Sequence, residues 1–403
     1  MRHEEMRRTF NGSEYSRSFR GRPPKIVTDG QREAAARPPS FTSKCLLGGG
    51  LLLSLLYGGH HAHVLPRPDA AEESPQDAPA LNIEDSPRSE NRCWIFNHLQ
   101  KAGGTTVKRL LFDSWGSEST TYDSYQWKKG QGYAESVAAS LASPAGWSAA
   151  AGGYLEALRR TPAFQPDDER TPCRWFTVFR HPVSRLVSAY YYCREDPSDQ
   201  LCASEFVSSR NVDLVTFARH WGNFALRQFA LGFVSHDEVK DFLVSPNGGG
   251  AMGLTAEQVE LMPGWYMLKL FLNDRSGVAD DTSPEGTRLE YMFRPVVDLL
   301  RDNYAVVGIL EDWNATLSLF DSALDMPGMT WHEEFERSGK LNVDTRFKGE
   351  KQDVLQQALS DPEIEKHLSL DLRLYGQAVD IFNQQRHSYG IAQHGGLDNV
   401  HRL

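Results

Sequence analysis

Cysteine is scarce in this sequence, and the spacings that commonly bind zinc are missing from it. The five cysteines in 403 residues form no C-x-x-C pair, and no H-E-x-x-H segment occurs. An excess of positive charge is missing as well, because the formal net charge is −10. Binding of nucleic acid without sequence preference depends on basic side chains that neutralise many phosphates. We therefore expect neither a metal site nor a nucleic-acid partner.

The first 90 residues differ in composition from the rest of the chain. Residues 1–44 are rich in Arg, Ser and Pro and have no hydrophobic period, which predicts a disordered tail. Residues 45–65 begin with the apolar run CLLGGGLLLSLLYGG and have their basic flank on the N-terminal side. The run alone is shorter than the roughly 20 residues of a membrane span, but the whole segment reaches that length. Residues 66–90, rich in Pro, Ala and acidic residues, predict a flexible stem.

This order of segments predicts a single-pass type II membrane protein. The positive-inside rule places the tail in the cytoplasm, so residues 45–65 are interpreted as a signal-anchor transmembrane segment. Residues 91–403 then form a folded domain in the lumen. The alternative is that a misassigned start codon has added the leader. Residues 1–90 contain 12 basic and 12 acidic residues, so the net negative charge belongs entirely to residues 91–403.

Four of the five cysteines can form two disulfides in an oxidising lumen, because Cys45 lies in the apolar run. Cys193 and Cys202 enclose a turn-rich segment that can close locally. Cys93 and Cys173 each directly precede an apolar, strand-like run, so their positions would be adjacent if those strands were parallel neighbours. Of the three possible pairings we favour 193–202 with 93–173. The alternative is four reduced, buried thiols.

The segment HLQKAGGTTVKRLLF has the composition of an anion-binding turn between a strand and a helix. An apolar run ends before it, and the apolar residues of 107–111 recur at helical spacing. Gly103 and Gly104 leave the backbone bare where the helix begins, and the first amides of a helix attract an anion. Lys101 adds a full charge. Because this lysine precedes the glycines, the segment differs from the nucleotide-triphosphatase pattern, in which Lys follows them.

A second segment, RWFTVFRHPVSRLVSAYYYC, also predicts a strand followed by a helix. Its first residues alternate aromatic and β-branched side chains, and Pro182 suits the first position of a helix. Arg180 follows the strand, and Ser188 lies nearly two turns along the helix. A guanidinium and a hydroxyl in this arrangement can bind a phosphate.

Taken together, HLQKAGGTT and FTVFRHPVSRLVSAY resemble the Golgi carbohydrate sulfotransferases, in the broad family of the heparan sulfate 2-O- and 6-O-sulfotransferases. The downstream segments NFALRQFALG, YAVVGILEDWNATLSLF, KLNVDTRFKGE and LDLRLYGQAVDIF are similar to further segments of that family. The resemblance covers roughly residues 92 to 384. It implies transfer of a sulfuryl group from 3′-phosphoadenosine 5′-phosphosulfate to a hydroxyl of a glycan acceptor in the Golgi, without a metal.

The resemblance also implies roles for individual residues. In the family the first motif binds the 5′-phosphosulfate and the second motif binds the 3′-phosphate, which here falls to Arg180 and Ser188. Lys101 would in addition neutralise the oxygen that bridges phosphate and sulfate as the bond breaks. The residues assigned to the 5′-phosphosulfate are Lys101, Ala102, Gly103, Gly104, Thr105 and Thr106. Ala102 replaces a Thr that is frequent in the family.

The sequence departs from the family at the catalytic base, which must accept the proton of the acceptor hydroxyl. The heparan-type enzymes have a His in a Gly-His-aromatic segment, whereas this chain has Gly153 at the corresponding position. We rank Glu156 first as the base, since it is the carboxylate nearest to Gly153 in the sequence. The alternative interpretation is that Glu156 has no catalytic role and lies on a solvated helix face. His98 comes second, and the alternative interpretation is that it is a structural side chain at the end of a strand. His181 comes third.

We expect an α/β fold with a P-loop-like central, mainly parallel sheet flanked by helices and with the donor at the carboxyl ends of the strands. Asn314 begins an N-A-T glycosylation sequon. A Golgi sulfotransferase is the leading functional hypothesis. One alternative is a catalytically inactive protein that binds the donor, motivated by the missing His. Another, less favoured, is a P-loop kinase.

Overall fold

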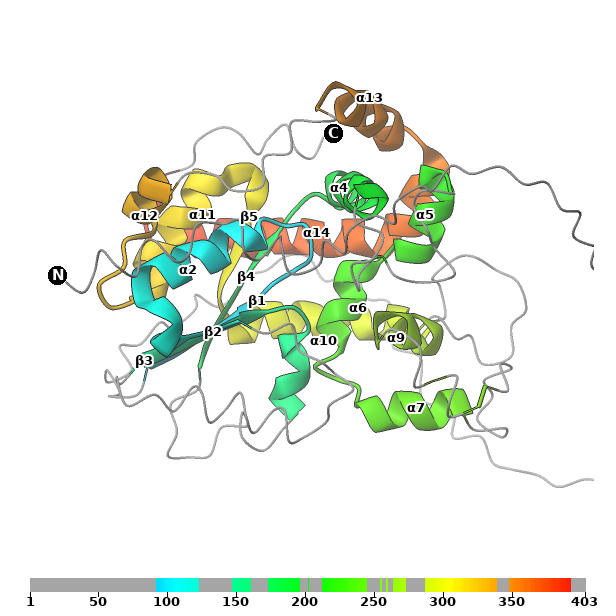
Figure 1. Ribbon diagram of the computed structural model, residues 1–403, viewed down its shortest axis with the longest axis horizontal. Helices are drawn as coiled ribbons and strands as arrows, with labels where there is room; N and C mark the ends of the chain where they lie inside the picture. The colour runs from blue at the N-terminus through cyan, green and yellow to red at the C-terminus, as the bar shows by residue number, and fades with distance from the viewer. Residues whose placement is uncertain are drawn as a thin grey trace, which may run out of the picture. The chain divides into compact units, whose positions relative to one another are not determined.

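In the computed structural model, a five-stranded parallel sheet lies at the centre of the described residues (Figure 1). The model describes residues 92–122, 147–160, 173–195, 202, 212–244, 254–255, 259, 264–272, 287–338 and 348–392. The strands are β1 (Arg92–Asn97), β2 (Thr120–Tyr122), β3 (Trp147–Gly152), β4 (Arg174–Phe179) and β5 (Tyr304–Ile309). Their order across the sheet is β2-β3-β1-β4-β5, and every neighbouring pair is parallel.

Helices pack around this sheet, which confirms the predicted α/β class with a parallel sheet. The long helices are α2 (Gly104–Ser119), α4 (Pro182–Glu195), α10 (Arg288–Asn303), α13 (Lys348–Leu359) and α14 (Pro362–Ser388). Shorter helices are α5 (Leu214–Trp221), α6 (Phe224–Ala230), α7 (His236–Val244), α9 (Gly264–Leu272), α11 (Trp313–Leu319) and α12 (Trp331–Ser338). The remaining helical segments are the 3₁₀ segments η2 (Leu155–Arg160) and η4 (Leu310–Asp312) and the π-type η5 (Phe320–Leu324).

The strand order places a topological switch point between β1 and β4. From β1 the chain continues through α2 toward β2 and β3, whereas from β4 it continues toward β5 on the other side. Right-handed crossovers that run in opposite directions lie on opposite faces of a sheet. The connections after β1 and β4 therefore diverge, and ligands of open α/β sheets bind in the crevice that such divergence leaves. Both predicted motifs begin at this position.

The core explains why these strands are nearly continuous apolar runs. Trp94, Ile95 and Phe96 of β1 are at most 1% exposed, as expected for a parallel strand that is covered on both faces. A second cluster of buried side chains lies between α4, α5, α13 and α14 and includes Trp221 and Phe224. This second cluster holds α4, and with it Ser188, against the C-terminal helices.

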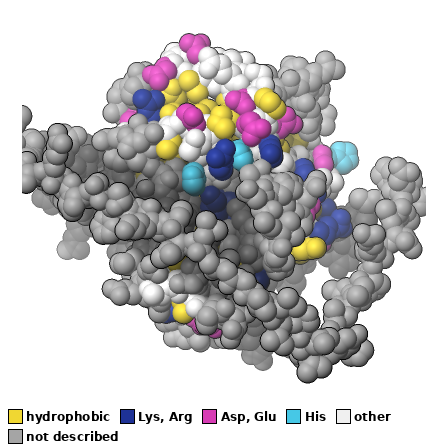
Figure 2. All heavy atoms as spheres, turned by 90° about the vertical axis from the view of Figure 1, so that its right-hand side faces the viewer, with side chains coloured by type: hydrophobic (Ala, Val, Ile, Leu, Met, Phe, Trp, Pro, Cys, Tyr) yellow, Lys and Arg dark blue, Asp and Glu magenta, His cyan; other side chains and the backbone are white. Residues whose placement is uncertain are grey.

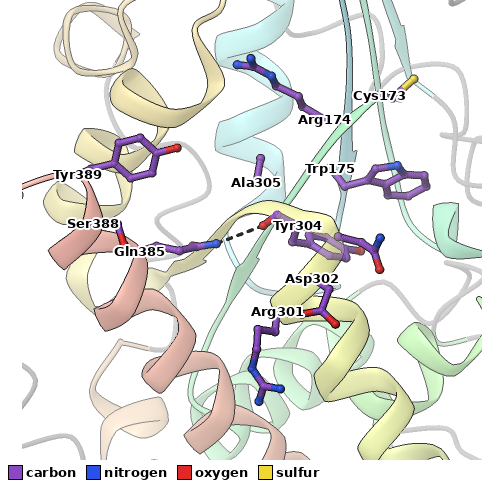
Figure 3. Close-up of a pocket in the computed structure, with 11 residues that line it drawn as sticks. Cys173, Arg174, Trp175, Arg301, Asp302, Tyr304, Ala305, Gln385, Ser388 and Tyr389 are labelled. Carbon is purple, nitrogen blue, oxygen red and sulfur yellow. Dashed lines mark hydrogen bonds between the residues drawn. The ribbon is translucent and has the colours of Figure 1, made fainter. Parts of the chain in front are cut away.

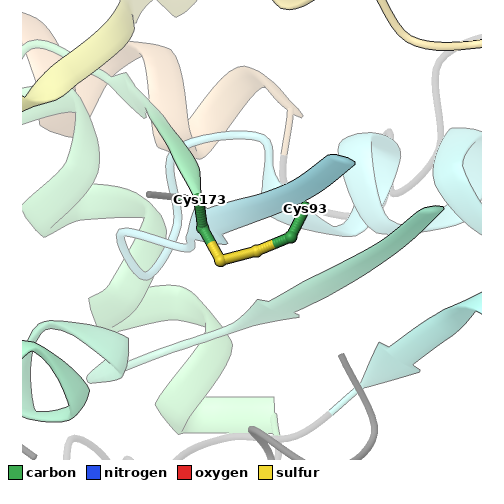
Figure 4. Close-up of a disulfide and its surroundings, with 2 residues drawn as sticks. All are labelled: Cys93 and Cys173. Carbon is green, nitrogen blue, oxygen red and sulfur yellow. A yellow bond between two sulfur atoms is a disulfide. The ribbon is translucent and has the colours of Figure 1, made fainter. Parts of the chain in front are cut away.

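The described residues contain two disulfides, and both predicted pairings are confirmed. Cys93 and Cys173 join the starts of β1 and β4 with their Cα atoms 4.7 Å apart (Figure 4). This contact follows from the pairing of those two strands, which are parallel neighbours. Cys193 and Cys202 close the local loop with a Cα–Cα distance of 5.1 Å.

The predicted tail, anchor and stem, residues 1–90, lie outside the described residues. Among the helices that are described, none is both long and apolar enough for a membrane crossing. In the same part of the chain, no three His, Cys, Asp or Glu side chains gather in a way that could hold a metal ion.

Candidate functional site

The turn between β1 and α2, here called the cradle (residues 98–106), has the predicted strand–turn–helix form. Two of its residues adopt the left-handed backbone conformation, Lys101 with φ 64° and Gly103 with φ 85°. Gly103 reaches this conformation without cost, whereas a lysine adopts it only where the surrounding structure holds it. The amide of Ala102 donates to the carbonyl of Leu99 at 3.2 Å, which tightens the turn. The amide of Thr106 donates to the carbonyl of Gly103 at 3.0 Å, so of the first three amides of α2 those of Gly104 and Thr105 are the ones left for an anion.

Gly104 cannot be replaced by a larger residue without moving His98. A Cβ atom on Gly104 would lie 1.7 Å from Cδ2 of His98, so the imidazole packs directly against the first residue of α2. Gly103 is confined from the other side, because its Cβ would lie 2.9 Å from Leu310 Cδ1. Side chains from β1 and from the end of β5 therefore enclose the two glycines, which are needed for space as well as for conformation.

The cradle is electropositive around a neutral imidazole. Burial, together with the charges of Lys108 and Lys101, lowers the pKa of His98 to about 3. Burial also lowers the pKa of Lys108. Sequence reasoning did not identify Lys108, although its position one turn beyond Gly104 on α2 was a usable signal. An anion placed here would meet two ammonium groups as well as the helix amides.

The exposure of the other predicted cradle residues divides them into two groups. Ala102 and Thr106 are buried, at 1% and 5% exposed, whereas Thr105 is exposed. A buried alanine fits a position at which the backbone, and not the side chain, faces a ligand. The Thr105 hydroxyl is the one placed to reach a bound group from solvent.

The second motif meets the cradle at the switch point. The guanidinium of Arg180, which follows β4, donates from Nη1 to the carbonyl oxygen of Lys101 at 3.2 Å. Nζ of Lys101 lies 3.8 Å from the ring centroid of Tyr192 on α4. Tyr192 stands one helical turn after Ser188, which is half-buried. The structure thus brings Lys101, Arg180 and the Ser188 region of α4 together from separate parts of the sequence.

Glu311, which follows β5, contacts the residue that follows Arg180 at the end of β4. One of its carboxylate oxygens accepts from the amide of His181 at 3.0 Å, and the other accepts from the Tyr375 hydroxyl at 3.1 Å. Burial lowers the pKa of Arg180, while the charge of Glu311 raises it. Burial and Arg180 lower the pKa of His181 to about 4, and its ring contacts Tyr375 edge-on at 5.4 Å.

Glu156 lies in a closed, buried network and not on the solvated helix face that we considered as its alternative environment. It is 0% exposed, its Oε2 accepts from Arg159 Nε at 2.7 Å, and its Oε1 accepts from the Tyr304 hydroxyl. The Asn97 amide extends the network by donating to the Tyr304 oxygen at 3.0 Å. Burial raises the pKa of Glu156. Because both oxygens are occupied, an acceptor hydroxyl has no access to them in this arrangement.

Gly153 lies beside the cradle. A Cβ on Gly153 would be 2.9 Å from Nε2 of Gln100 and 3.7 Å from the carbonyl oxygen of His98. The same carbonyl accepts from Gln228 Nε2 of α6 at 2.8 Å. The amide of Gln100 therefore lies where a side chain on residue 153 would stand, and the His98 carbonyl links this position to Gln228.

The glycosylation sequon is split between surface and core. Asn314 is exposed on the first turn of α11. Thr316 is 0% exposed, and its hydroxyl donates to the carbonyl of Ile309 at 2.8 Å while accepting from the amide of that residue at 2.9 Å. The threonine holds the end of β5 in place, and glycosylation of Asn314 stays a prediction.

A pocket of about 280 Å³ lies at the opposite end of the sheet, where β4 and β5 begin (Figure 3). A hydrogen bond from Gln385 Nε2 to the Tyr304 carbonyl, 3.2 Å long, crosses its wall. Parallel α/β sheets bind ligands at the carboxyl ends of their strands, so this pocket is separate from the candidate site.

Comparisons with known proteins do not decide the family. Neither a protein-family model nor a curated protein matches this chain. The cradle and the residues gathered around it therefore carry what can be inferred about function.

Proposed function

We propose that this protein transfers a sulfuryl group from 3′-phosphoadenosine 5′-phosphosulfate to a hydroxyl of a carbohydrate. The observation that carries the proposal is the contact between Arg180 and the Lys101 carbonyl. It places a guanidinium beside an amide-lined, lysine-bearing turn at the switch point of a parallel sheet. A donor with negative groups at both its 5′ and 3′ positions needs two anion sites of this kind in one crevice.

The cradle would hold the 5′-phosphosulfate through the amides at the start of α2, with Lys101 and Lys108 supplying charge. Arg180 and Ser188 would hold the 3′-phosphate. During transfer, the acceptor oxygen bonds to sulfur as the bond from sulfur to the bridging oxygen breaks, and negative charge grows on that bridging oxygen. Lys101 would stabilise this charge, which is an interaction stronger in the transition state than in the ground state.

His98 is our proposed base, in place of Glu156. Its imidazole packs against Gly104, where the sulfuryl group would lie, and it is neutral, so one ring nitrogen can accept the acceptor's proton. The pKa of His98 is about 3 when no donor is bound. The negative charge of a bound donor would offset the charges of Lys101 and Lys108, which raises the pKa of His98 and strengthens it as a base.

A second candidate, a protein that binds the donor without transferring sulfate, is favoured by one observation. No imidazole stands at Gly153, the position beside the cradle where the related sequences have one. The two candidates share the same binding residues and differ only in chemistry.

The deciding experiment incubates the full-length protein with donor labelled in its sulfuryl group and with a panel of glycans and tyrosine peptides. Transfer to a glycan that is lost in Lys101→Ala and kept in Arg294→Ala, a change at an exposed cation of α10, supports the proposal. Binding of adenosine 3′,5′-bisphosphate without transfer to any acceptor selects the second candidate. Magnesium-dependent use of ATP would instead select a P-loop kinase.

We further propose that the domain is lumenal and anchored in the Golgi membrane by residues 45–65. The two disulfides support an oxidising compartment. Protease added outside intact Golgi vesicles should then leave residues 91–403 uncut, and digestion of that region without detergent would contradict this topology.

A further inference from the structure

A buried guanidinium on α6 has no carboxylate in contact with it among the described residues. Arg227 is 3% exposed, its Nη2 donates to the Trp221 carbonyl at 3.3 Å, and its Nε has no partner. The nearby carboxylate of Asp371 is already occupied. It accepts from Arg185 at 2.5 Å and from the amides of Ala225 and Leu226 at 3.1 and 2.9 Å.

Further cationic and imidazole groups converge on the same region from three other helices. Lys269 of α9 has its Nζ 3.3 Å from the Arg219 carbonyl and 3.4 Å from Nδ1 of His220, both on α5. His367 of α14 is 8% exposed, and its Nε2 is buried without a partner. Lys, Arg and His side chains gather near the middle of the face in Figure 2, which is the side on which α5 and α9 lie in Figure 1.

The electrostatic interactions show that these groups act on one another. Burial, together with Arg227 and Arg219, lowers the pKa of Lys269 to about 7. Burial, followed by Lys269, Arg219 and His367, lowers the pKa of His220 to about 4. Burial lowers the pKa of Arg227 to about 10, against the opposing charge of Asp371. Each shift disfavours the positive form; burial is its largest cause, and neighbouring cations add to it.

Buried charges in proteins are ordinarily paired, since an unpaired one costs several kcal/mol. Among the described residues, Asp371 is already occupied, Glu363 acts on His367, and Asp213 acts on Arg219, so none of these carboxylates contacts Arg227 or Lys269. Nε of Arg227 is a hydrogen-bond donor that has no acceptor. Nε2 of His367 also has no partner, and it is a donor in the tautomer that carries a hydrogen on this nitrogen. A small anion would satisfy them together with the ammonium of Lys269.

We propose that Arg227, Lys269, His220 and His367 form a second anion site, for a compact oxyanion such as a sulfate or phosphate group. The site is distinct from the cradle and does not depend on the proposed function. It is nevertheless close to the cradle along α6, because Gln228, the residue after Arg227, donates to the His98 carbonyl. The oxyanion is either a free inorganic ion or an ester group on a larger molecule.

The test titrates inorganic sulfate into full-length protein by calorimetry, at ionic strength held constant with chloride. A Lys101→Ala/Arg180→Ala background weakens binding at the cradle. In that background we expect saturable sulfate binding that weakens at least about ten-fold in Lys269→Met, because a charge-assisted contact is lost. Lys269→Arg, which keeps the charge, should retain binding. Lys351→Met, a matched change on α13 outside the cluster, should retain it as well.

Equal sulfate affinity with and without Lys269→Met would overturn the proposal, and so would the absence of any binding in the cradle-deficient background. If the double variant does not fold, wild type compared with Lys269→Met gives the same test, since both keep the cradle. Galactose 6-sulfate and unsulfated galactose distinguish the sources. Tighter binding of the ester than of inorganic sulfate assigns the site to a larger molecule, and the reverse order assigns it to the free ion.

Discussion

The guanidinium of Arg180 donates to the carbonyl oxygen of Lys101 at 3.2 Å, although the two residues stand 79 positions apart. This contact ties the end of β4 to the left-handed residue of the cradle. Arg180 can therefore act in two ways, by binding a ligand directly and by holding the Lys101 backbone in a conformation that lysine rarely adopts.

We expect Arg180→Ala to weaken binding of adenosine 3′,5′-bisphosphate by about ten- to a hundred-fold, the effect of losing one charge-assisted contact. Lys101→Ala should lower turnover at saturating donor far more than it lowers donor affinity, because its charge acts mainly in the transition state. Calorimetry and initial rates measure the two effects. Arg294→Ala serves as the control, and equal effects of Lys101→Ala on binding and turnover would contradict the assigned role.

Gly104→Ala should abolish donor binding while leaving the fold intact. The new methyl group would displace the His98 ring, which it would otherwise approach to 1.7 Å, and the cradle would lose its shape. Gly376→Ala on α14 is the matched control, since nothing lies within 4 Å of its added Cβ. Adding His98→Ala to Gly104→Ala makes room for the methyl group and should restore binding without restoring transfer. Unchanged binding in Gly104→Ala alone would show that the ring is not packed as described.

Glu156→Gln should reduce stability and not turnover per folded molecule. The substitution leaves Arg159 without its carboxylate and places an amide against the Tyr304 hydroxyl, at a cost of roughly 1–3 kcal/mol in the free energy of unfolding. Urea denaturation measures this cost, and Tyr304→Phe should lower stability through the same network. Loss of transfer in a Glu156→Gln protein of wild-type stability would return Glu156 to the role of base.

Sequence reasoning identified the features that local pattern determines. The strand–turn–helix at Lys101, the start of α4 at Pro182 and the pairing of Cys93 with Cys173 follow from apolar runs, helix signals and the neighbourhood of parallel strands. The environment of Glu156 could not be predicted, because its partner Tyr304 lies 148 residues away and the local sequence LEALRR indicates only a charged helix.

The cationic cluster escaped prediction for the same reason. Arg227, Lys269 and His367 stand on three helices, and no spacing in the sequence relates one to another. Their proximity depends on how α6, α9 and α14 pack, which is determined by apolar contacts spread over the whole domain. The charge total was misleading as well, since a chain with a net charge of −10 contains a local excess of buried cations.

Sulfate binding at the second site should tighten as the pH falls from 8 to 6. The pKa of Lys269 is about 7 without an anion, so the fraction that carries the positive charge rises through this range. Around it, the pKa of Arg227, about 10, keeps that guanidinium protonated, and the pKa of His220, about 4, keeps that imidazole neutral. Burial, followed by the charge of Arg219, lowers the pKa of His367 as well. A bound anion in turn raises the pKa of Lys269, so proton uptake should accompany binding near neutral pH.

Calorimetry in two buffers of different ionisation enthalpy, with the cradle-deficient protein, measures this proton uptake directly. Lys269→Arg separates Lys269 from every other titrating group, because an arginine stays charged throughout the range and should bind sulfate with an affinity independent of pH. A pH dependence that persists in Lys269→Arg would assign the titration to His220 or His367. A flat profile in the protein that retains Lys269 would show that its ammonium does not contact the anion.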